Sequence, residues 1–261
     1  MLGAPGACTP LPTELDVMIL ADMTGSHAGT ISSNARVLAT ELAAPLLMDS
    51  SVRVGVAYFA DFPVGFYGSM GDVPFGGSIA PTTDPMAVGA ALMSLPMMSG
   101  GDLPESGVEA LYVLAGGTPH PLARAMTCPS GTLTGGCWRP GAQRIVVMLT
   151  DVAQHNAPSS AVPPGTLVAP YGPDLTPPSP VWIDARSAML SQGVALFAIV
   201  PNTSPSGPME DPSAQLQLLI TELGGNPATQ IVTYPLAFPV DLTTAAREMA
   251  MRIATFAMLP P

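Results

Sequence analysis

A regular alternation of short apolar runs and stretches with helical periodicity constrains the fold of this chain more than any other feature. The apolar runs span residues 15–21, 52–59, 144–150, 194–200 and 230–234. Helical spacing of apolar residues follows the first run, up to about residue 49, and recurs at 84–95, 106–115, 181–192, 212–223 and 242–256. This order is typical of a parallel sheet wrapped by helices. The sequence therefore predicts a doubly wound, mostly parallel α/β sheet flanked by helices.

The length and composition of the chain favour one domain. With 261 residues and 48% hydrophobic content, the chain can bury a large core, and no linker or internal repeat divides it. We expect a single domain over residues 1–261, with a core at about 13–258 and an amino-terminal extension at 1–12. The stretch 156–180 holds eight prolines and is expected to be a long ordered loop, either functional or a plain surface covering.

Oxygen-bearing side chains stand where two of the apolar runs end. Asp22, Thr24 and Ser26 follow the first run, and Asp151 follows the third. In an open α/β sheet the carboxyl ends of parallel strands face one crevice, so these side chains can converge there. They form a set of hard oxygen ligands that suits a divalent cation such as Mg²⁺. The alternative is that each aspartate only caps the following helix by accepting amide hydrogen bonds.

The charged residues exclude several classes of partner and cofactor. Eight basic and 19 acidic side chains give a formal net charge of -11, which repels phosphate backbones and anionic lipids. Nucleic acid and membrane surfaces are therefore not expected as partners. All eight basic residues are arginine. Without lysine the chain cannot form a P-loop, a protein-kinase site or a pyridoxal Schiff base.

The cysteines point to an oxidising compartment. Cys128 and Cys137 flank a short Gly-rich segment that can bring their sulfurs together, so we expect a local disulfide and leave Cys8 unpaired. A zinc site that adds His120 is the alternative, but the spacing is not that of paired zinc knuckles. The sequence predicts no membrane span. Its start does not resemble a signal peptide, so export would require a signal that this chain does not contain.

Four short motifs occur in the order found in one family of domains. They are Asp22-Met-Thr-Gly-Ser26, the run from Val54 to Pro63 with Asp61 in it, Asp102-Leu-Pro-Glu-Ser-Gly107, and Trp138-Arg139 followed by the run 144–151 and His155. Together they resemble the von Willebrand factor A domain, whose metal loop reads Asp-x-Ser-x-Ser. The similarity is greatest to the I-like domain of integrin β subunits and spans about residues 13–258.

This resemblance implies a magnesium site at the carboxyl edge of the sheet. Thr24, Ser26 and Glu105 would bind the ion directly, whereas Asp22 and Asp151 would hold it through water. One coordination position would stay open to an anionic oxygen from outside, such as an Asp or Glu carboxylate of a partner protein. Mn²⁺ could replace Mg²⁺. The residues lead to a cation independently, since three crowded carboxylates repel one another unless a cation offsets their charge.

The resemblance also implies a calcium site beside the first. Its ligands would be Asp61, Asp102, the Pro104 carbonyl and the other carboxylate oxygen of Glu105, all of which are present. Gly100, however, stands where the family has an asparagine ligand, so water would have to fill that place.

We therefore expect a non-enzymatic domain that binds a protein or glycan ligand through a carboxylate that the ligand donates. Low charge content, Pro-rich loops and the absence of lysine favour a bacterial protein that is exported or on the cell surface. One alternative is a scaffolding module in a surface assembly that uses metal only to stabilise its loops. A hydrolase with Ser26 as nucleophile and His27 or His155 beside it is disfavoured, because the Gly-x-Ser-x-Gly nucleophile elbow is missing. The oligomeric state stays open.

Overall fold

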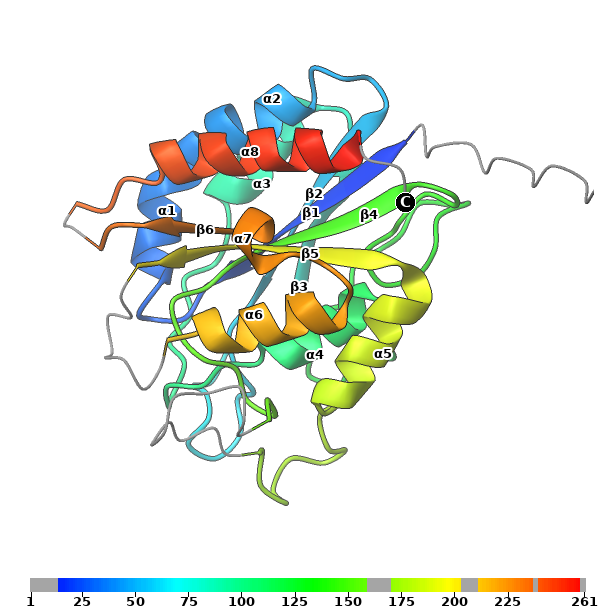
Figure 1. Ribbon diagram of the computed structural model, residues 1–261. Coiled ribbons are helices and arrows are strands. Elements are labelled where there is room, and N and C mark those ends of the chain that lie inside the picture. The colour runs from blue at the N-terminus through cyan, green and yellow to red at the C-terminus, as the bar shows by residue number, and fades with distance from the viewer. Residues whose placement is uncertain (1–13, 159–169, 203–210, 237–238, 259–261) are drawn as a thin grey trace, which may run out of the picture.

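The computed structural model describes residues 14–158, 170–202, 211–236 and 239–258. At its centre lies a six-stranded sheet with the order β3-β2-β1-β4-β5-β6 (Figure 1). The strands are β1 (Leu15–Asp22), β2 (Val52–Phe59), β3 (Gly76–Thr82), β4 (Gln143–Leu149), β5 (Val194–Pro201) and β6 (Ile231–Tyr234). Neighbouring strands pair in parallel, except that β3 is antiparallel to β2. The predicted doubly wound, mostly parallel α/β fold is confirmed.

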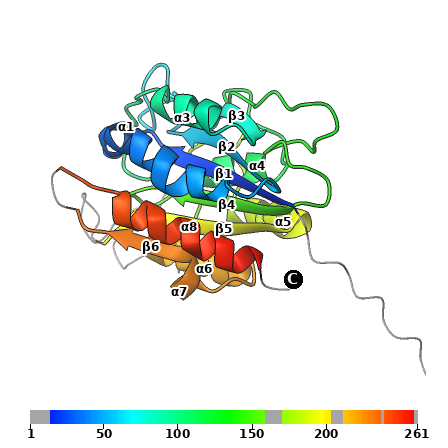
Figure 2. The ribbon, with the colours of Figure 1, turned by 90° about the horizontal axis from the view of Figure 1, so that it is seen from above.

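Helices cover both faces of the sheet, as the two ribbon views show (Figures 1 and 2). One face carries α1 (Ala28–Val37), the π-helical segment η1 (Leu38–Ala43), α2 (Ala44–Leu46), α3 (Pro85–Met93) and α8 (Thr243–Ala257). The other face carries α4 (Gly107–Leu114), α5 (Trp182–Gln192) and α6 (Ser213–Glu222). The short α7 (Pro227–Gln230) leads into β6 and is absent from the sequence prediction. The other helices lie where the apolar periodicity predicts them.

The central strands are buried on both faces, which explains their continuous apolar runs. Val17 and Ile19 of β1 belong to the core that includes residues of α1 and α8. Met18 and Leu20 belong to the opposite core, which includes residues of α4 and α6. Successive side chains of a strand point to opposite faces, so one strand contributes to two cores.

Two local features differ from the prediction. The edge strand β3 is missed because Gly76–Thr82 contains two glycines and a proline and is only partly buried, so it lacks the apolar signal of a central strand. A helix is expected after the first apolar run and up to about residue 49, but the observed helix ends at Leu46. Its middle, Leu38–Ala43, has π-helical hydrogen bonding, which sequence periodicity cannot distinguish from an α-helix.

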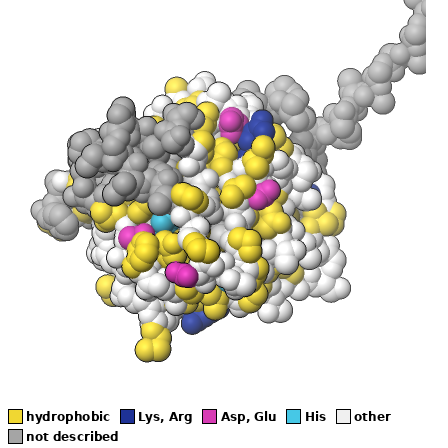
Figure 3. Space-filling model, turned by 90° about the horizontal axis from the view of Figure 1, so that it is seen from below, with side chains coloured by type: hydrophobic (Ala, Val, Ile, Leu, Met, Phe, Trp, Pro, Cys, Tyr) yellow, Lys and Arg dark blue, Asp and Glu magenta, His cyan; other side chains and the backbone are white. Residues whose placement is uncertain are grey.

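The surface carries few charges. Seen from the side of α4, α5 and α6, apolar side chains are dispersed among isolated acidic and basic ones (Figure 3). Ile183 and Leu190 of α5, for example, are exposed. None of the described helices has the length and apolar character needed to cross a bilayer.

The predicted disulfide is present between Cys128 and Cys137. It closes a short loop that precedes Trp138, whose indole nitrogen donates to the Leu114 carbonyl at the end of α4. The bridge therefore anchors this long connection against the sheet-covering helix. Cys8 lies outside the described residues.

Replacing Cys128 and Cys137 together with serine is expected to lower the free energy of unfolding by about 2–3 kcal/mol. Closure of a loop of about ten residues restricts the unfolded chain by this amount in the chain-entropy model. Urea denaturation of the variant and the wild type, both in oxidising buffer, measures the difference. Equal midpoints and slopes for the two proteins would contradict a stabilising bridge.

The winding of the sheet creates one crevice between β1 and β4. The chain leaves β1 toward α1 on one face, and after β4 it returns through α5 on the other face. Neighbouring strands whose connections leave in opposite directions define a topological switch point, where open α/β sheets bind ligands. Asp22 is the last residue of β1, and Asp151 follows β4 by two positions. Both carboxylates therefore lie at this crevice.

Candidate functional site

Asp22 is held rigidly at the carboxyl end of β1. Its side chain is fully buried, and one carboxylate oxygen accepts hydrogen bonds from the Thr24 hydroxyl at 2.7 Å and the Thr24 amide at 3.1 Å. The other oxygen accepts from the hydroxyl of Thr150, which follows β4, at 2.8 Å. The bond from Thr150 links the two strand ends directly. Asp22 thus orients the Thr24 hydroxyl within the crevice.

Ser26 and Asp151 continue this hydrogen-bonded chain. The Ser26 hydroxyl donates to Asp151 Oδ1 at 3.1 Å and lies 3.4 Å from the Thr24 hydroxyl oxygen. Asp151 is 2% exposed. Four of the predicted magnesium ligands therefore lie together, although Asp151 is more than 120 positions away from the other three in the sequence.

Glu105 brings a third carboxylate to the same place. Its backbone pairs with the segment after β4, because the Glu105 amide donates to the Ala153 carbonyl and the His155 amide donates to the Glu105 carbonyl. The side chain is 3% exposed, and its Oε2 has no hydrogen-bond partner among the described residues. A Cβ built at Gly100 would lie 2.9 Å from Glu105 Oε1 and 3.4 Å from Thr24 Cβ, so the Glu105 carboxylate lies near the Thr24 side chain. All five predicted magnesium ligands are therefore gathered at this crevice, where four of them are buried and Ser26 is exposed.

Two carboxyl groups of this cluster, those of Glu105 and Asp151, have a raised pKa. Burial is the main cause that raises the pKa of Glu105 well above its ordinary value, and the negative charges of Asp22, Asp61 and Asp102 raise it further. Burial likewise raises the pKa of Asp151 to about 6, although the nearby His27 acts in the opposite direction. Placing several carboxylates in a desolvated site is unfavourable unless a cation offsets their charge. The cluster is therefore suited to a divalent metal ion.

We expect the metal-free protein to lose stability as the pH rises from about 4 to about 6. Over this range the folded state keeps protons on carboxyls such as Asp151 that the unfolded chain has released, so the free energy of unfolding falls. A pKa that rises from 3.8 to about 6 corresponds to about 3 kcal/mol for one group. Excess Mg²⁺ should remove the decline, because the ion binds the ionised carboxylates. Urea denaturation across this range, with Mg²⁺ or with a chelator, measures both effects; stability that rises with pH in chelator would contradict the prediction.

His27 is a member of the cluster that sequence reasoning weighed only as part of a hydrolase. It is 1% exposed, its Nε2 lies 3.1 Å from the Tyr234 hydroxyl, and its Nδ1 has no hydrogen-bond partner in the part of the chain described. One of its ring nitrogens lies within 4.8 Å of carboxylate oxygens of Asp22 and Asp151. Its place directly after Ser26 in the sequence is the signal that could have indicated this.

Asp72 is a second residue that sequence reasoning missed. Its buried carboxylate accepts hydrogen bonds from the amides of Ser69, Ser99 and Gly100. It thereby holds the loop that precedes Asp102 and packs against the cluster. Gly100 adopts a left-handed conformation with φ +64, and a Cβ there would lie 2.9 Å from Glu105 Oε1. The family's asparagine at this position therefore cannot be accommodated while Glu105 keeps this orientation.

The residues predicted for the calcium site are close together, but their surroundings differ from that prediction. Asp61 and Asp102 each have a carboxylate oxygen within 4.8 Å of a ring nitrogen of His155. The Tyr171 hydroxyl donates to Asp61 Oδ1, and burial raises the pKa of Asp61 to about 6. Pro104 is buried on the loop immediately before Glu105. The cluster thus includes an imidazole and a phenol that the calcium prediction did not contain.

Tyr171 belongs to the proline-rich stretch predicted as a long loop. Residues 159–169 of that stretch lie outside the described residues. Its remaining part starts at the crevice and returns to it, because Tyr171 contacts Asp61 and the Asn156 side-chain amide donates to the Pro180 carbonyl at 2.9 Å. The described part of the loop therefore belongs to the site and is more than a surface covering.

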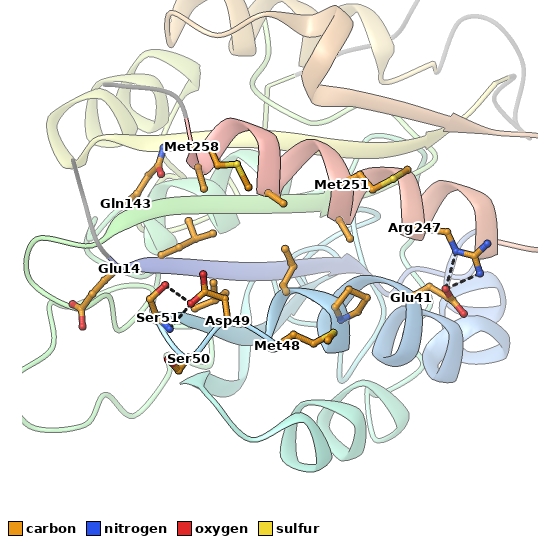
Figure 4. A pocket seen from close by; sticks show the side chains of 17 residues that line it. Glu14, Glu41, Met48, Asp49, Ser50, Ser51, Gln143, Arg247, Met251 and Met258 are labelled. Atoms are coloured by element: carbon orange, nitrogen blue, oxygen red, sulfur yellow. Dashed lines mark hydrogen bonds and ion pairs between the residues drawn. The ribbon is translucent and has the colours of Figure 1, made fainter.

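A cavity of about 850 Å³ lies at the amino ends of the strands, at the end of the sheet opposite the acidic cluster (Figure 4). Its lining includes Glu14 and Gln143 at the amino ends of β1 and β4, and Met48 and Met258 beside α2 and α8. The eight residues of β1 separate it from Asp22, a distance of roughly 20–25 Å at the rise of a β-strand. The cavity and the acidic cluster are thus separate features.

Comparisons with known proteins identify the fold and no family. No family model matches this chain, and no curated protein matches its sequence. Among solved structures, proximal thread matrix protein 1 from the mussel byssus superposes with a TM-score of 0.56 at 11% sequence identity. The match covers 92% of this chain and 48% of that protein, so this chain spans about half of its neighbour's length. At such low identity the likeness concerns the arrangement of helices and strands alone.

Proposed function

We propose that this chain is a metal-dependent binding domain that holds Mg²⁺ through Asp22, Thr24, Ser26, Glu105 and Asp151. The bound ion would present one open coordination position to a carboxylate of a protein or glycan ligand. The observation that carries the proposal is the buried Glu105 Oε2, which lacks a hydrogen-bond partner within the described residues yet sits among further carboxylates. A cation is the group that offsets such a charge.

The donor set supports Mg²⁺ in particular. Hydroxyl and carboxylate oxygens are the ligands of a small, hard cation, and Mg²⁺ often keeps several waters while one or two carboxylates bind it directly. Asp22 and Asp151 already accept hydrogen bonds from the two hydroxyls, so each could hold a hydroxyl or a water in place toward the ion. Mn²⁺ prefers similar ligands and could substitute. The motif order shared with the von Willebrand factor A domain and the integrin β I-like domain adds support.

The proposed setting is extracellular, and the proposed activity is binding without catalysis. The disulfide between Cys128 and Cys137 supports an oxidising compartment. The structural neighbour from the mussel byssus is, by its name, a matrix protein. That name also favours a second candidate, a scaffolding module whose metal only stabilises its loops.

Water proton relaxation of the Mn²⁺-loaded protein tests the proposal and separates the two candidates. Calorimetric titration first establishes that Mg²⁺ and Mn²⁺ bind. A short peptide with one aspartate, and the same peptide with asparagine, are then added to the Mn²⁺ form. A ligand-binding site predicts that only the aspartate peptide displaces metal-bound water and reduces the relaxation enhancement. A scaffolding metal predicts no response to either peptide, and the absence of metal binding below millimolar concentration would remove the mechanism altogether.

A further inference from the structure

The second cluster beside the acidic centre has a donor set that does not fit the calcium ion implied by the family resemblance. Ca²⁺ takes six to eight oxygen ligands, whereas this cluster contains the imidazole of His155. Gly100 supplies no side-chain oxygen in place of the family's asparagine. We propose that Asp61, Asp102 and His155 bind a first-row transition-metal ion such as Zn²⁺, with two carboxylate oxygens and one ring nitrogen as protein ligands.

The distances between the donor atoms support a single shared ion. His155 Nε2 lies 3.5 Å from Asp61 Oδ2 and 3.4 Å from Asp102 Oδ1. These separations are longer than the usual range for a hydrogen bond. Two ligands that each lie at the normal bond length from a tetrahedral zinc ion are about 3.4 Å apart. Both distances from the His155 nitrogen therefore match the spacing around such an ion, and the two carboxylate oxygens lie within 4.8 Å of each other.

Asp61 is arranged with one oxygen held and the other aimed into the cluster. Its Oδ1 accepts from the Tyr171 hydroxyl and from the Phe62 amide. Its Oδ2 is fully buried and has no hydrogen bond of normal length among the described residues, since His155 Nε2 lies 3.5 Å away. Hydrogen bonds that fix one carboxylate oxygen while the other binds the metal are the usual outer shell of protein metal sites. The buried Oδ2 is thus the observation, apart from the clustering itself, that points to a ligand.

Backbone contacts between three segments of the chain bring the donors together. Asp61 follows β2 by two residues, and the Ala60 carbonyl beside it accepts from the amide and the hydroxyl of Ser106. The Glu105 bridge to Gln154 then aligns the loop that carries Asp102 with the segment that carries His155. The site is therefore built on a strand end and on two paired segments, which favours a defined geometry.

Charge and access also suit a divalent ion. Two carboxylates and a neutral imidazole around one divalent cation leave no net charge in a largely buried place. The Asp102 side chain is 25% exposed, whereas those of Asp61 and His155 are nearly inaccessible. Solvent therefore reaches the cluster from the side of Asp102, where a fourth ligand, water or a group from outside, could bind. This inference does not depend on Mg²⁺ binding at the first site.

Calorimetric titration with Zn²⁺ and visible absorption of the Co²⁺-loaded protein, both in excess Mg²⁺ to occupy the first site, test the proposal. The wild type should bind one Zn²⁺ more tightly than Ca²⁺, and its Co²⁺ form should show the intense bands of tetrahedral cobalt. Asp102→Asn should weaken Zn²⁺ binding at least about tenfold and His155→Gln at least about 100-fold, because removing even outer partners of a metal site costs 10–100-fold. Asp102 is the safer variant for folding, since its side chain is partly exposed.

His120→Gln is the matched control, because His120 is also buried and its ring packs against Phe62 beside the cluster, but its ring nitrogens contact the backbone of Pro177 and Leu122 and no carboxylate of the cluster. It should retain wild-type Zn²⁺ affinity and cobalt bands. The proposal is overturned if the wild type prefers Ca²⁺, if it binds no Zn²⁺ and His155 is only an ion-pair partner, or if the two cluster variants bind as the wild type does. It is also overturned if His27→Gln, and not His155→Gln, removes the cobalt bands, because the ion would then occupy the first site.

Discussion

Glu105→Gln is expected to raise the stability of the metal-free protein while lowering its Mg²⁺ affinity at least about 100-fold. The glutamine keeps the size of the side chain but removes an ionisable carboxyl whose ionisation is opposed by burial and by three nearby carboxylates. Keeping a carboxyl protonated in the folded state above its ordinary pKa costs about 1.4 kcal/mol for each pH unit, so removing it stabilises the metal-free protein at neutral pH. The Mg²⁺ affinity falls because a direct metal ligand is lost. Removing even an outer partner of a metal site lowers metal affinity 10–100-fold. Urea denaturation in chelator and calorimetric titration with Mg²⁺ measure the two effects.

Glu109→Gln is the matched control for this experiment. Glu109 is also buried, and burial raises its pKa to about 6, but its carboxylate accepts from the His120 amide outside the metal cluster. We expect this variant to keep wild-type Mg²⁺ affinity. If only Glu105→Gln gains stability and loses Mg²⁺ affinity, the carboxylate cluster is a site that serves metal binding at the expense of stability. Unchanged Mg²⁺ affinity in Glu105→Gln would remove Glu105 from the ligands.

Asp16→Ala is expected to lower the free energy of unfolding by about 3–5 kcal/mol. Asp16 is fully buried in β1, where its carboxylate accepts from the Arg139 amide at 2.6 Å and from Arg139 Nε at 2.7 Å. The guanidinium also donates to the carbonyls of Leu15 and Ser51 and so joins the starts of β1 and β2. Removing one partner of a buried ion pair has this cost, because Arg139 would keep only the half-exposed Glu14 as a charged partner. Chemical denaturation compared with the wild type measures it.

The exposed pair between Glu41 and Arg247 provides the comparison. There too an arginine donates twice to one carboxylate, but the Arg247 side chain is 60% exposed. Glu41→Ala should therefore change stability by less than about 1 kcal/mol. Asp16 lies at the opposite end of β1 from Asp22, so the folded fraction of Asp16→Ala should bind Mg²⁺ normally. Equal destabilisation by the two substitutions would show that burial does not increase the contribution of the Asp16 ion pair to stability.

Most of the fold could be predicted because its central strands and amphipathic helices carry their signal within single segments. The run that forms β2 is predicted with its observed bounds, and the bounds of the other parallel strands differ from the prediction by at most one residue at either end. β3 could not be found in this way, since it forms by pairing with the edge of β2 and not through an apolar run of its own. The π-helical turns of η1 were equally invisible, because they keep the apolar spacing of a helix.

The candidate site was predictable in part, for a similar reason. Asp22, Thr24, Ser26 and Asp151 follow strand ends, so a parallel sheet brings them together whatever the loops do. Glu105 lies before a helix and not after a strand, and only a family resemblance suggested its role. Its metal-binding role, like that of the other four, stays a prediction.

The sequence by itself determined the order of the parallel strands and of the helices other than α7, the doubly wound class of the sheet, and the crevice at which its acidic residues would meet. These follow from local periodicity and from the fixed handedness of strand connections. Only the tertiary structure decided that His155 and Tyr171 join Asp61 and that Arg139 reaches back to Asp16. Such contacts depend on how loops distant in the chain pack against one another, and hydrophobic periodicity carries no information about them.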